Sequence, residues 1–390
     1  MSFLAPLGAA VLPEGIRTRH VSGVNGLRMH ILEAGFEAPD RPVLLLLHGF
    51  PELAWSWRRI MVPLAAQGYH VIAPDQRGYG RTTGWLDGYD QDLRPFAMLN
   101  LAKDAVALLF ALGIRTADAV VGHDFGAAVA SWCGLTRPDV FQRCAIMSAP
   151  FSGPPGLPFG VAAADASARS PDAEPSRGGG SLDVALGALA RPRKHYQRYY
   201  STRPANADMM EAPEGVHAFL RAYFHHKSAD WKDNRPFRLQ DWSAGEMSRM
   251  PTYYIMDRDE TMAETVRKHM PSDAAIAGCA WLTEADLSVY AGEYQRTGFQ
   301  GGLNWYRARY EAHLNAELAL YASRAIDCPS LFVAGASDWG VQQAPGAFER
   351  MQTQAFSDMR GAHLVEGAGH WVQQEQPEQV VALLKRFLAS

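Results

Sequence analysis

Short apolar runs, each ending in polar residues, recur near both ends of this 390-residue chain and constrain its fold most strongly. They are VLLLLHGF (43–50), HVIAPDQRG (70–78), AVVGHDFG (119–126), RCAIMSAP (143–150), PSLFVAGASD (329–338) and AHLVEGAGHW (362–371). Runs of this kind are typical of strands buried on both faces of a parallel sheet. Helical periodicity at 101–114 and 376–388 accompanies them. We therefore predict an α/β fold, a doubly wound and mostly parallel sheet flanked by helices.

The segment 151–325 breaks this rhythm. It is rich in Tyr, Trp, Met and His and contains few β-like runs. We interpret it as a mainly helical cap inserted between two sheet-forming parts, 1–150 and 326–390. Within the cap, residues 160–181 have few bulky apolar side chains and are predicted to form a mobile loop.

Charge and cysteine usage exclude several classes of partner. The net charge is -4 and the charges are scattered, which argues against nucleic acid or an anionic membrane as the main partner. No apolar stretch reaches the roughly 18 residues of a membrane-spanning helix. The four cysteines lie far apart without metal-ligand spacing, so we expect reduced thiols in a cytoplasmic protein that needs no metal or cofactor. A homodimer is left open.

Polar residues follow the apolar runs at the carboxyl ends of the predicted strands. In doubly wound sheets, functional residues collect at this edge. The residues that reach it are His48, Asp75, Asp124, Asp338 and, in the loop after the last strand, His370. This clustering predicts an active site above the sheet.

Asp124 stands in the middle of GHDFG, where a strand runs into a predicted helix. In hydrolases with a nucleophile elbow this turn carries a serine, as Gly-x-Ser-x-Gly, and exposes it above the sheet. Gly122 and Gly126 make room for such a turn. An aspartate that merely caps a helix is the alternative. The other polar strand ends favour a nucleophilic role.

The remaining parts of a hydrolase site are present in the required chain order. Backbone N–H groups of Phe50, in HGFP, and of Phe125 are expected to form an oxyanion hole. His370, in GHW, comes late in the chain, as this order requires of the general base. Asp338, in AGASDWG, ends the preceding strand and is the best candidate to orient His370.

Five motifs together resemble the α/β-hydrolase superfamily and, within it, the soluble epoxide hydrolases. They are HGFPE, PDQRGYGRT, GHDFGA, SDWG and GHWVQQEQPE, and the resemblance extends into the cap at HYQRYY (195–200) and GGLNWYR (301–307). It covers most of the chain except about 155–190 and about 230–270. The aspartate elbow is shared with haloalkane and fluoroacetate dehalogenases, whereas the cap tyrosine motif is more particular to epoxide hydrolases.

The resemblance implies two ring-opening tyrosines, Tyr196 and Tyr306, with Tyr199 and Tyr200 as alternatives to Tyr196. The sequence departs from the family in having Phe125 where tryptophan is usual and in its longer cap. We expect a small apolar epoxide and water as substrates. The residues expected to bind the epoxide are Phe50, Pro51, Phe125, Trp305 and Trp371.

The leaving group separates the possible reactions. A carboxylate attacks a saturated carbon and becomes an ester, which water activated by a histidine can hydrolyse. An opened epoxide leaves as an alkoxide and needs a donor that stays protonated, such as tyrosine with a pKa of about 10. A departing halide is stabilised by Asn or indole N–H donors beside the nucleophile. This chain has Phe50 and Phe125 there, which offer only backbone donors. We expect an epoxide hydrolase; the alternatives are a haloalkane dehalogenase and a non-catalytic ligand-binding protein of the same fold.

Overall fold

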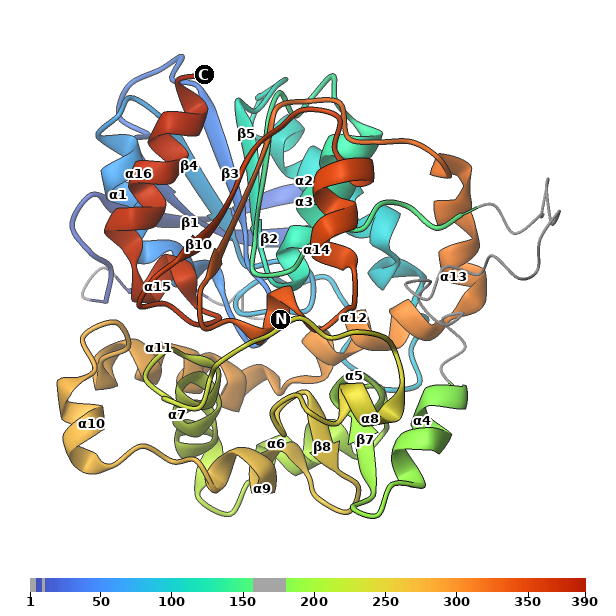
Figure 1. Cartoon of the computed structure of the whole chain (residues 1–390). Coiled ribbons are helices and arrows are strands. Elements are labelled where there is room, and N and C mark those ends of the chain that lie inside the picture. The colour runs from blue at the N-terminus through green and yellow to red at the C-terminus, as the bar shows by residue number, and fades with distance from the viewer. Residues whose placement is uncertain (1–4, 9–10, 157–179) are drawn as a thin grey trace, which may run out of the picture.

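An eight-stranded sheet forms the centre of the computed structural model, which describes residues 5–8, 11–156 and 180–390 (Figure 1). Its strand order is β1-β2-β4-β3-β5-β6-β9-β10. The strands are Ile16–Val24 (β1), Leu27–Ala34 (β2), Val43–Leu47 (β3), His70–Pro74 (β4), Ala119–His123 (β5), Cys144–Met147 (β6), Ser330–Gly335 (β9) and Met359–Val365 (β10). Positions 160–179 of the predicted mobile loop lie outside the described residues.

From β4 to β10 the neighbouring strands are parallel, as the apolar runs predict. Every residue of β3, β5, β6 and β9 is buried, because helices cover both faces of the sheet. The antiparallel strands β1 and β2 at one edge are absent from the predicted strands. Asn25 and Gly26, both with positive φ, connect them in a tight hairpin turn.

Helices cover the two faces of the sheet in the usual doubly wound manner. They are Arg58–Ala65 (α1), Met98–Ala111 (α2), Phe125–Thr136 (α3), Ala347–Arg350 (α14), Val372–Glu375 (α15) and Pro377–Leu388 (α16). Helices α1 and α16 pack side by side on one face, and α2 packs on α3 on the other (Figure 1). Short 3-10 turns lie at Ala54–Trp57, Arg94–Phe96 and Trp339–Val341, and a π-helical turn at Met351–Ala355.

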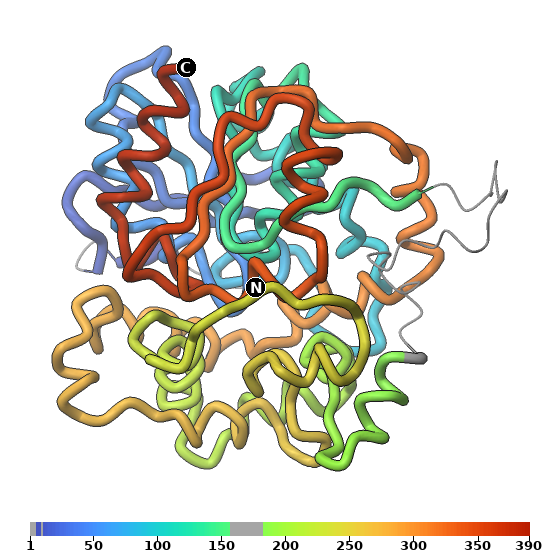
Figure 2. The backbone as a smooth tube through the Cα atoms, viewed as in Figure 1, coloured from blue at the N-terminus to red at the C-terminus, as the bar shows by residue number. Residues whose placement is uncertain are grey.

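The chain leaves the sheet after β6 and returns at β9, and the intervening segment forms the cap below the sheet in Figures 1 and 2. Its helices are Gly180–Gly187 (α4), Tyr196–Tyr200 (α5), Ala205–Met210 (α6), Gly215–Lys227 (α7), Ala244–Met247 (α8), Met262–Arg267 (α9), Asp273–Gly278 (α10), Glu284–Thr297 (α11), Gln300–Tyr310 (α12) and Ala312–Ala316 (α13), followed by a 3-10 turn at Glu317–Tyr321. A two-stranded sheet, Arg193–His195 (β7) and Ile255–Asp257 (β8), completes it. The mainly helical cap is confirmed, while its boundaries at 151 and 325 stay predictions.

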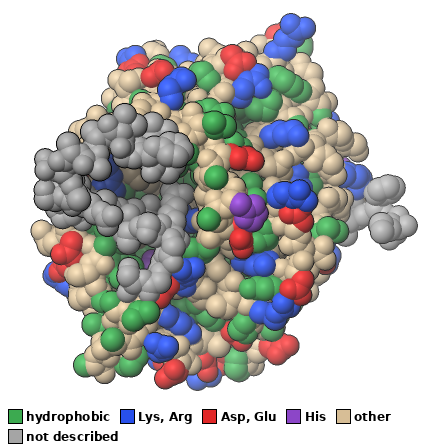
Figure 3. All heavy atoms as spheres, turned by 90° about the vertical axis from the view of Figure 1, so that its right-hand side faces the viewer, with side chains coloured by type: hydrophobic (Ala, Val, Ile, Leu, Met, Phe, Trp, Pro, Cys, Tyr) green, Lys and Arg blue, Asp and Glu red, His purple; other side chains and the backbone are tan. Residues whose placement is uncertain are grey.

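The surface charges are mixed in sign, and the cysteines form no disulfide among the described residues. Figure 3 shows acidic and basic side chains interspersed over the described part of one face. The four cysteines are free thiols, and three of them are buried. Within the described ranges, no helix has the length and apolarity needed to cross a bilayer.

Two glycines join the cap to the core. Gly78, in the loop after β4, faces Gly301 in the first turn of α12 so closely that a Cβ on Gly301 would lie 1.9 Å from the Gly78 carbonyl oxygen. The Trp305 indole, one turn further along α12, donates to the carbonyl of Arg77 at 2.9 Å. The absence of side chains therefore lets α12 lie directly on the core loop.

Replacing Gly301 by alanine tests this joint. The added methyl group must push α12 away from the core, and overpacking of this kind costs about 1–3 kcal/mol. We expect Gly301→Ala to lower the free energy of unfolding by about that amount in chemical denaturation. Gly292→Ala, at an exposed position of α11, is the matched control, because nothing lies within 4 Å of its Cβ position. It should leave stability unchanged or raise it by up to about 1 kcal/mol, and equal losses in both variants would contradict the joint.

Candidate active site

Asp124 follows β5 and immediately precedes α3, on a backbone turn with φ 53° and ψ -120°. This conformation is uncommon for a residue with a side chain and holds the carboxylate above the sheet. The turn depends on glycine, since a Cβ on Gly122 would lie 2.1 Å from the Gly126 carbonyl oxygen. The strand–turn–helix geometry of a nucleophile elbow is therefore present around Asp124.

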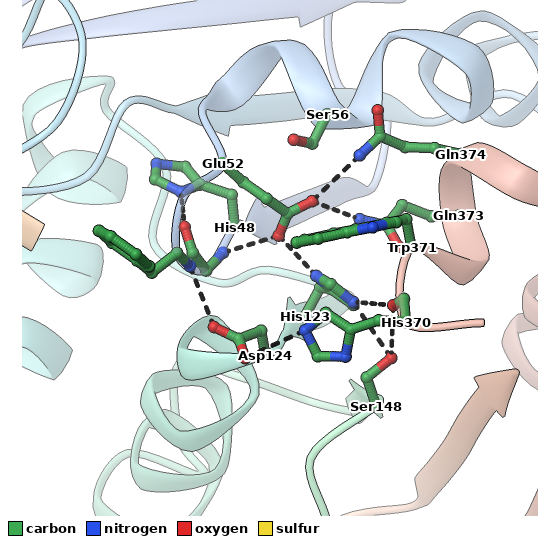
Figure 4. Close-up of polar contacts among 12 residues, drawn as sticks. His48, Glu52, Ser56, His123, Asp124, Ser148, His370, Trp371, Gln373 and Gln374 are labelled. Carbon is green, nitrogen blue, oxygen red and sulfur yellow. Dashed lines mark hydrogen bonds and ion pairs between the residues drawn. The ribbon is translucent and has the colours of Figure 1, made fainter. Parts of the chain in front are cut away.

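The two oxygens of Asp124 have different partners. Oδ1 accepts the backbone N–H of Phe50 at 3.0 Å. Oδ2 lies 3.3 Å from Nε2 of His370 (Figure 4). The N–H of Phe125 is in the first turn of α3, where backbone donors have no partner within the helix. One oxygen thus accepts a backbone N–H, and the other faces the imidazole.

His370 lies between two carboxylates. Its Nδ1 is 3.1 Å from Oδ1 of Asp338, which also accepts the backbone N–H of Gly340 at 2.7 Å. All three side chains of the Asp124–His370–Asp338 set are buried. The structure therefore brings together the three residues that chain order alone selected.

Charge near the site keeps the two aspartates ionised. Burial by itself would raise the pKa of Asp124, but His370 and, more weakly, Lys227 hold that pKa below its ordinary value. Burial likewise opposes ionisation of Asp338, and His370 together with the Gly340 N–H lowers its pKa. Asp124 is consequently a carboxylate, the form that a nucleophile requires.

One cavity of about 230 Å³ opens above Asp124, between the sheet and the cap. Its wall includes Phe125 and Trp305, two of the residues expected to contact substrate. Much of the remaining wall is apolar: Phe96, Met98, Trp132, Phe151, Trp242, Leu314 and Leu318. Such a lining suits an apolar small molecule.

Three other expected substrate contacts lie outside this wall. Phe50 and Pro51 are buried; the Phe50 N–H donates to Asp124, and the Phe50 ring packs edge-to-face on that of Tyr306 at 5.7 Å. Trp371 is fully buried; its ring packs on Phe224 at 4.5 Å and its indole donates to the Phe224 carbonyl. Phe50, Pro51 and Trp371 thus do not line the cavity in this structure, and their contact with substrate stays a prediction.

Tyr196 and Tyr306 both line the cavity with Asp124, and their rings are 6.1 Å apart. Burial first, and the nearby Asp124 charge second, raises the pKa of each phenol well above its ordinary value. Tyr199 and Tyr200, the alternatives to Tyr196, do not line the cavity. Their hydroxyls donate to Asp208 and Tyr223. The geometry favours Tyr196 over its neighbours.

A buried pair that the sequence did not single out, Glu52 and His123, lies against the backbone of His370. The carboxylate of Glu52 lies 2.5 Å from Nδ1 of His123, and Nε2 of His123 lies 2.6 Å from the carbonyl oxygen of His370 (Figure 4). Both ring nitrogens therefore face acceptors, which fits a doubly protonated ring. Burial opposes that charge, but Glu52 raises the pKa of His123 overall. In the sequence, the acidic residue directly after HGFP and the histidine directly before Asp124 are the features that could have indicated this pair.

Glu375 fixes the loop that carries His370. Its carboxylate accepts the backbone N–H groups on both sides of the base, from Gly369 at 2.9 Å and from Trp371 at 3.0 Å. It also accepts the N–H of Ala229 in the cap at 2.8 Å. One side chain thus holds the base loop and ties it to the cap.

Comparison with known proteins agrees with this geometry. Residues 42–212 match the family model described as alpha/beta hydrolase fold, so fold and site define an α/β-hydrolase-fold enzyme. Epoxide hydrolase A of Mycobacterium tuberculosis (strain ATCC 25618 / H37Rv) is 32% identical, covering 96% of this chain and 98% of that protein. Epoxide hydrolase B of the same strain is 31% identical, covering 95% and 98%. The solved epoxide hydrolase from an endophytic Streptomyces has a TM-score of 0.75 and 30% identity, covering 97% and 96%.

The chain therefore belongs to the epoxide hydrolase family. The resemblance that the motifs indicate is confirmed for the family, the fold and the class of enzyme.

Glu375→Gln tests the anchoring of the base loop. The amide keeps the shape but turns one acceptor into a donor that faces a backbone N–H, and an unpaired buried group costs about 1–3 kcal/mol. We expect a loss of that size in the free energy of unfolding, measured by urea denaturation. Glu378→Gln, at an exposed position in the first turn of α16, is the control and should cost less than about 1 kcal/mol.

The difference in stability between wild type and Glu375→Gln should depend on pH. Burial raises the pKa of Glu375 from 4.5 to about 7, even though three N–H groups lower it. A carboxyl whose folded pKa exceeds its unfolded value stabilises the fold most when protonated, so its contribution falls as pH rises from about 4.5 to 7. We expect the stability gap between wild type and Glu375→Gln to be wider at pH 5 than at pH 8. The same difference in stability at both pH values would contradict a raised pKa for Glu375.

Proposed function

We propose that this protein hydrolyses apolar epoxides to vicinal diols through a covalent ester on Asp124. The observation that carries the proposal is that Asp124, Tyr196 and Tyr306 line one apolar cavity. A nucleophile and two hydroxyl donors that face the same space are what opening an epoxide requires. Water is the second substrate.

In the first step, Oδ2 of Asp124 attacks a ring carbon, because Oδ1 is held by the Phe50 N–H. A carbon–oxygen bond forms to Asp124 while the ring carbon–oxygen bond breaks. The developing alkoxide takes hydrogen bonds, and then a proton, from the tyrosine hydroxyls. Their raised pKa values keep Tyr196 and Tyr306 protonated at neutral pH.

In the second step, water attacks the carbonyl carbon of the ester. Nε2 of His370, beside Oδ2, takes the proton from water, and Asp338 fixes the tautomer and stabilises the imidazolium. The former Oδ1 becomes the oxyanion between the N–H groups of Phe50 and Phe125. Collapse of this intermediate breaks the ester bond, and the imidazolium of His370 gives its proton to the departing alcohol oxygen. The proton left on the Asp124 carboxyl returns to the tyrosinate formed in the first step. The diol is released, and Asp124, His370 and the tyrosines regain their starting states. Losing one such N–H donor typically slows this kind of step by roughly 100- to 1,000-fold.

Two observations favour an epoxide over a halide. Phe125, directly after the nucleophile, has no side-chain donor, and the neighbouring Trp305 indole already donates to Arg77. The alternative of a non-catalytic binding protein would not need a nucleophile, a base and an acid in hydrogen-bonding order.

The cytoplasmic location and the homodimer stay predictions, as does the lack of nucleic-acid partners.

Removal of the base should trap the ester. We expect His370→Gln exposed to styrene oxide to gain the whole mass of the epoxide on Asp124, seen by intact-protein and peptide mass spectrometry. The double variant Asp124→Asn, His370→Gln is the control and should gain nothing. An adduct only from a haloalkane, lighter by the lost hydrogen halide, would make the protein a dehalogenase. No adduct from either reagent would favour the binding-protein alternative.

Removal of the tyrosine hydroxyls should slow only the first step. Because a positioned acid contributes about 100- to 10,000-fold, we expect Tyr196→Phe and Tyr306→Phe each to slow ester formation by about 100-fold or more in rapid-quench measurements. Hydrolysis of ester already formed should be little changed. Tyr199→Phe is the matched control, because its hydroxyl donates to Asp208 outside the cavity. A larger loss in the control than in Tyr196→Phe would reassign the donor.

A further inference from the structure

Lys227, the last residue of α7, is buried directly behind the catalytic residues with only 3% of its surface exposed. Four aromatic rings surround its ammonium group. The distances from Nζ to the ring centres are 5.5 Å for Tyr223, 5.9 Å for Tyr253, 5.0 Å for Tyr254 and 5.4 Å for Trp371. Ring faces attract a cation, so this cage favours the charged form of Lys227.

The position of this ammonium relative to the base is fixed through the backbone. The N–H of His370 donates to the carbonyl of Lys227 at 2.9 Å. Gly369 allows the approach, since a Cβ there would lie 2.6 Å from the same carbonyl oxygen. Trp371, one wall of the cage, directly follows His370. The backbone of Lys227 is therefore held directly against that of His370.

The buried carboxylates of the site outnumber the cations that are paired with them, so a further positive charge beside them is stabilising. Glu52 is matched by His123, since both ring nitrogens of His123 face acceptors. Asp124 and Asp338 share a single imidazole, that of His370. Two buried carboxylates that share one imidazole carry an uncompensated negative charge, which is costly away from water. The ammonium of Lys227 opposes that charge.

Lys227 responds to the same carboxylates. Burial lowers its pKa, while Asp124, Asp338 and Glu52 act in the opposite direction. In turn, Lys227 is among the groups that lower the pKa of Asp124 and of Asp338. None of the described carboxylates forms a direct ion pair with Lys227, so its charge acts on the set as a whole.

We propose that Lys227 is a positioning residue whose caged positive charge keeps Asp124 and Asp338 ionised on both sides of His370. This inference rests on the proposed function for its catalytic meaning. Lys227 does not line the cavity and does not touch the substrate. It acts through the nucleophile and the base, by opposing the protonation of the Asp124–His370 pair.

Loss of this charge has a definite sign. Without Lys227 the Asp124–His370 pair binds its next proton more tightly, so the acid limb of the reaction moves to higher pH. Removal of a nearby buried charge shifts the pH midpoint of such a titration by on the order of one unit. The titratable and charged groups that face this region from every packed element are Glu52, His123, Asp124, Tyr223, His226, Asp230, Tyr253, Tyr254, Asp338, His370 and Glu375.

The test compares neutral and charged replacements. Lys227→Met and Lys227→Gln remove the charge, and Lys227→Arg keeps it. Ester formation on each protein is followed from pH 5 to 9 by rapid quench with styrene oxide and intact mass. The Asp124–His370 pair is also titrated without substrate, through imidazole resonances that are assigned by their loss in His370→Gln.

We expect the acid limb and the resonance midpoint to rise by about one pH unit in both neutral variants and to stay close to wild type in Lys227→Arg. Neutral variants that lose thermal stability but keep both midpoints would overturn the proposal. Failure of both to fold while Lys227→Arg folds would assign a structural role and overturn it as well. If wild type forms neither ester nor diol, the proposed function fails, while the substrate-free titration still decides whether the Lys227 charge acts on the pair.

Discussion

A carboxylate held away from water at the end of β5 is the constraint on which the rest of the site depends. The proposed nucleophile Asp124 must stay ionised to attack carbon, yet burial opposes its charge. The protein answers with a backbone N–H from Phe50, the imidazole of His370 and a caged ammonium behind them. In the proposed mechanism the same donors serve the second step, because the carboxylate becomes an ester whose oxyanion occupies the same place.

The cap does more than close the cavity. Its α12 lies on the core through Gly78 and Gly301, and this helix carries Tyr306. Its α7 ends against the base loop, where Lys227 accepts the His370 N–H and Glu375 reaches Ala229. The hydroxyl donor on one side and the base on the other are thus both fixed by cap contacts. Displacement of the cap should therefore impair both steps of the reaction, beyond any change in substrate access.

Much of the fold follows from local pattern, because continuous apolar runs are unusual outside buried parallel strands. The strands β1 and β2 do not have such runs, although Asn25-Gly26 is a recognisable hairpin signal. β1 is partly exposed and irregular in burial, and β2, although mostly buried, carries His30 and Glu33 among its apolar residues. Asp124, His370 and Asp338 are predictable because topology alone brings strand ends together. Tyr196 cannot be separated from Tyr199 and Tyr200 in this way, since helical spacing places all three near one another.

Residues that act through tertiary contacts are the hardest to find. Trp371 adjoins His370 in sequence but faces α7. Glu52 meets His123 through a contact inside the core, between residues 71 positions apart in the chain. Lys227 and the bond from Ala229 to Glu375 depend on the packing of the cap on the core. Their charges have no local pattern in the chain.

A single turnover in water enriched with oxygen-18, with enzyme in excess over styrene oxide, tests the covalent ester most directly. Because water attacks the carbonyl carbon of the ester, the diol should contain no label after the first turnover, and the peptide carrying Asp124 should gain one oxygen-18. Label in the diol together with an unlabelled Asp124 would mean direct attack of water on the epoxide and would contradict the account.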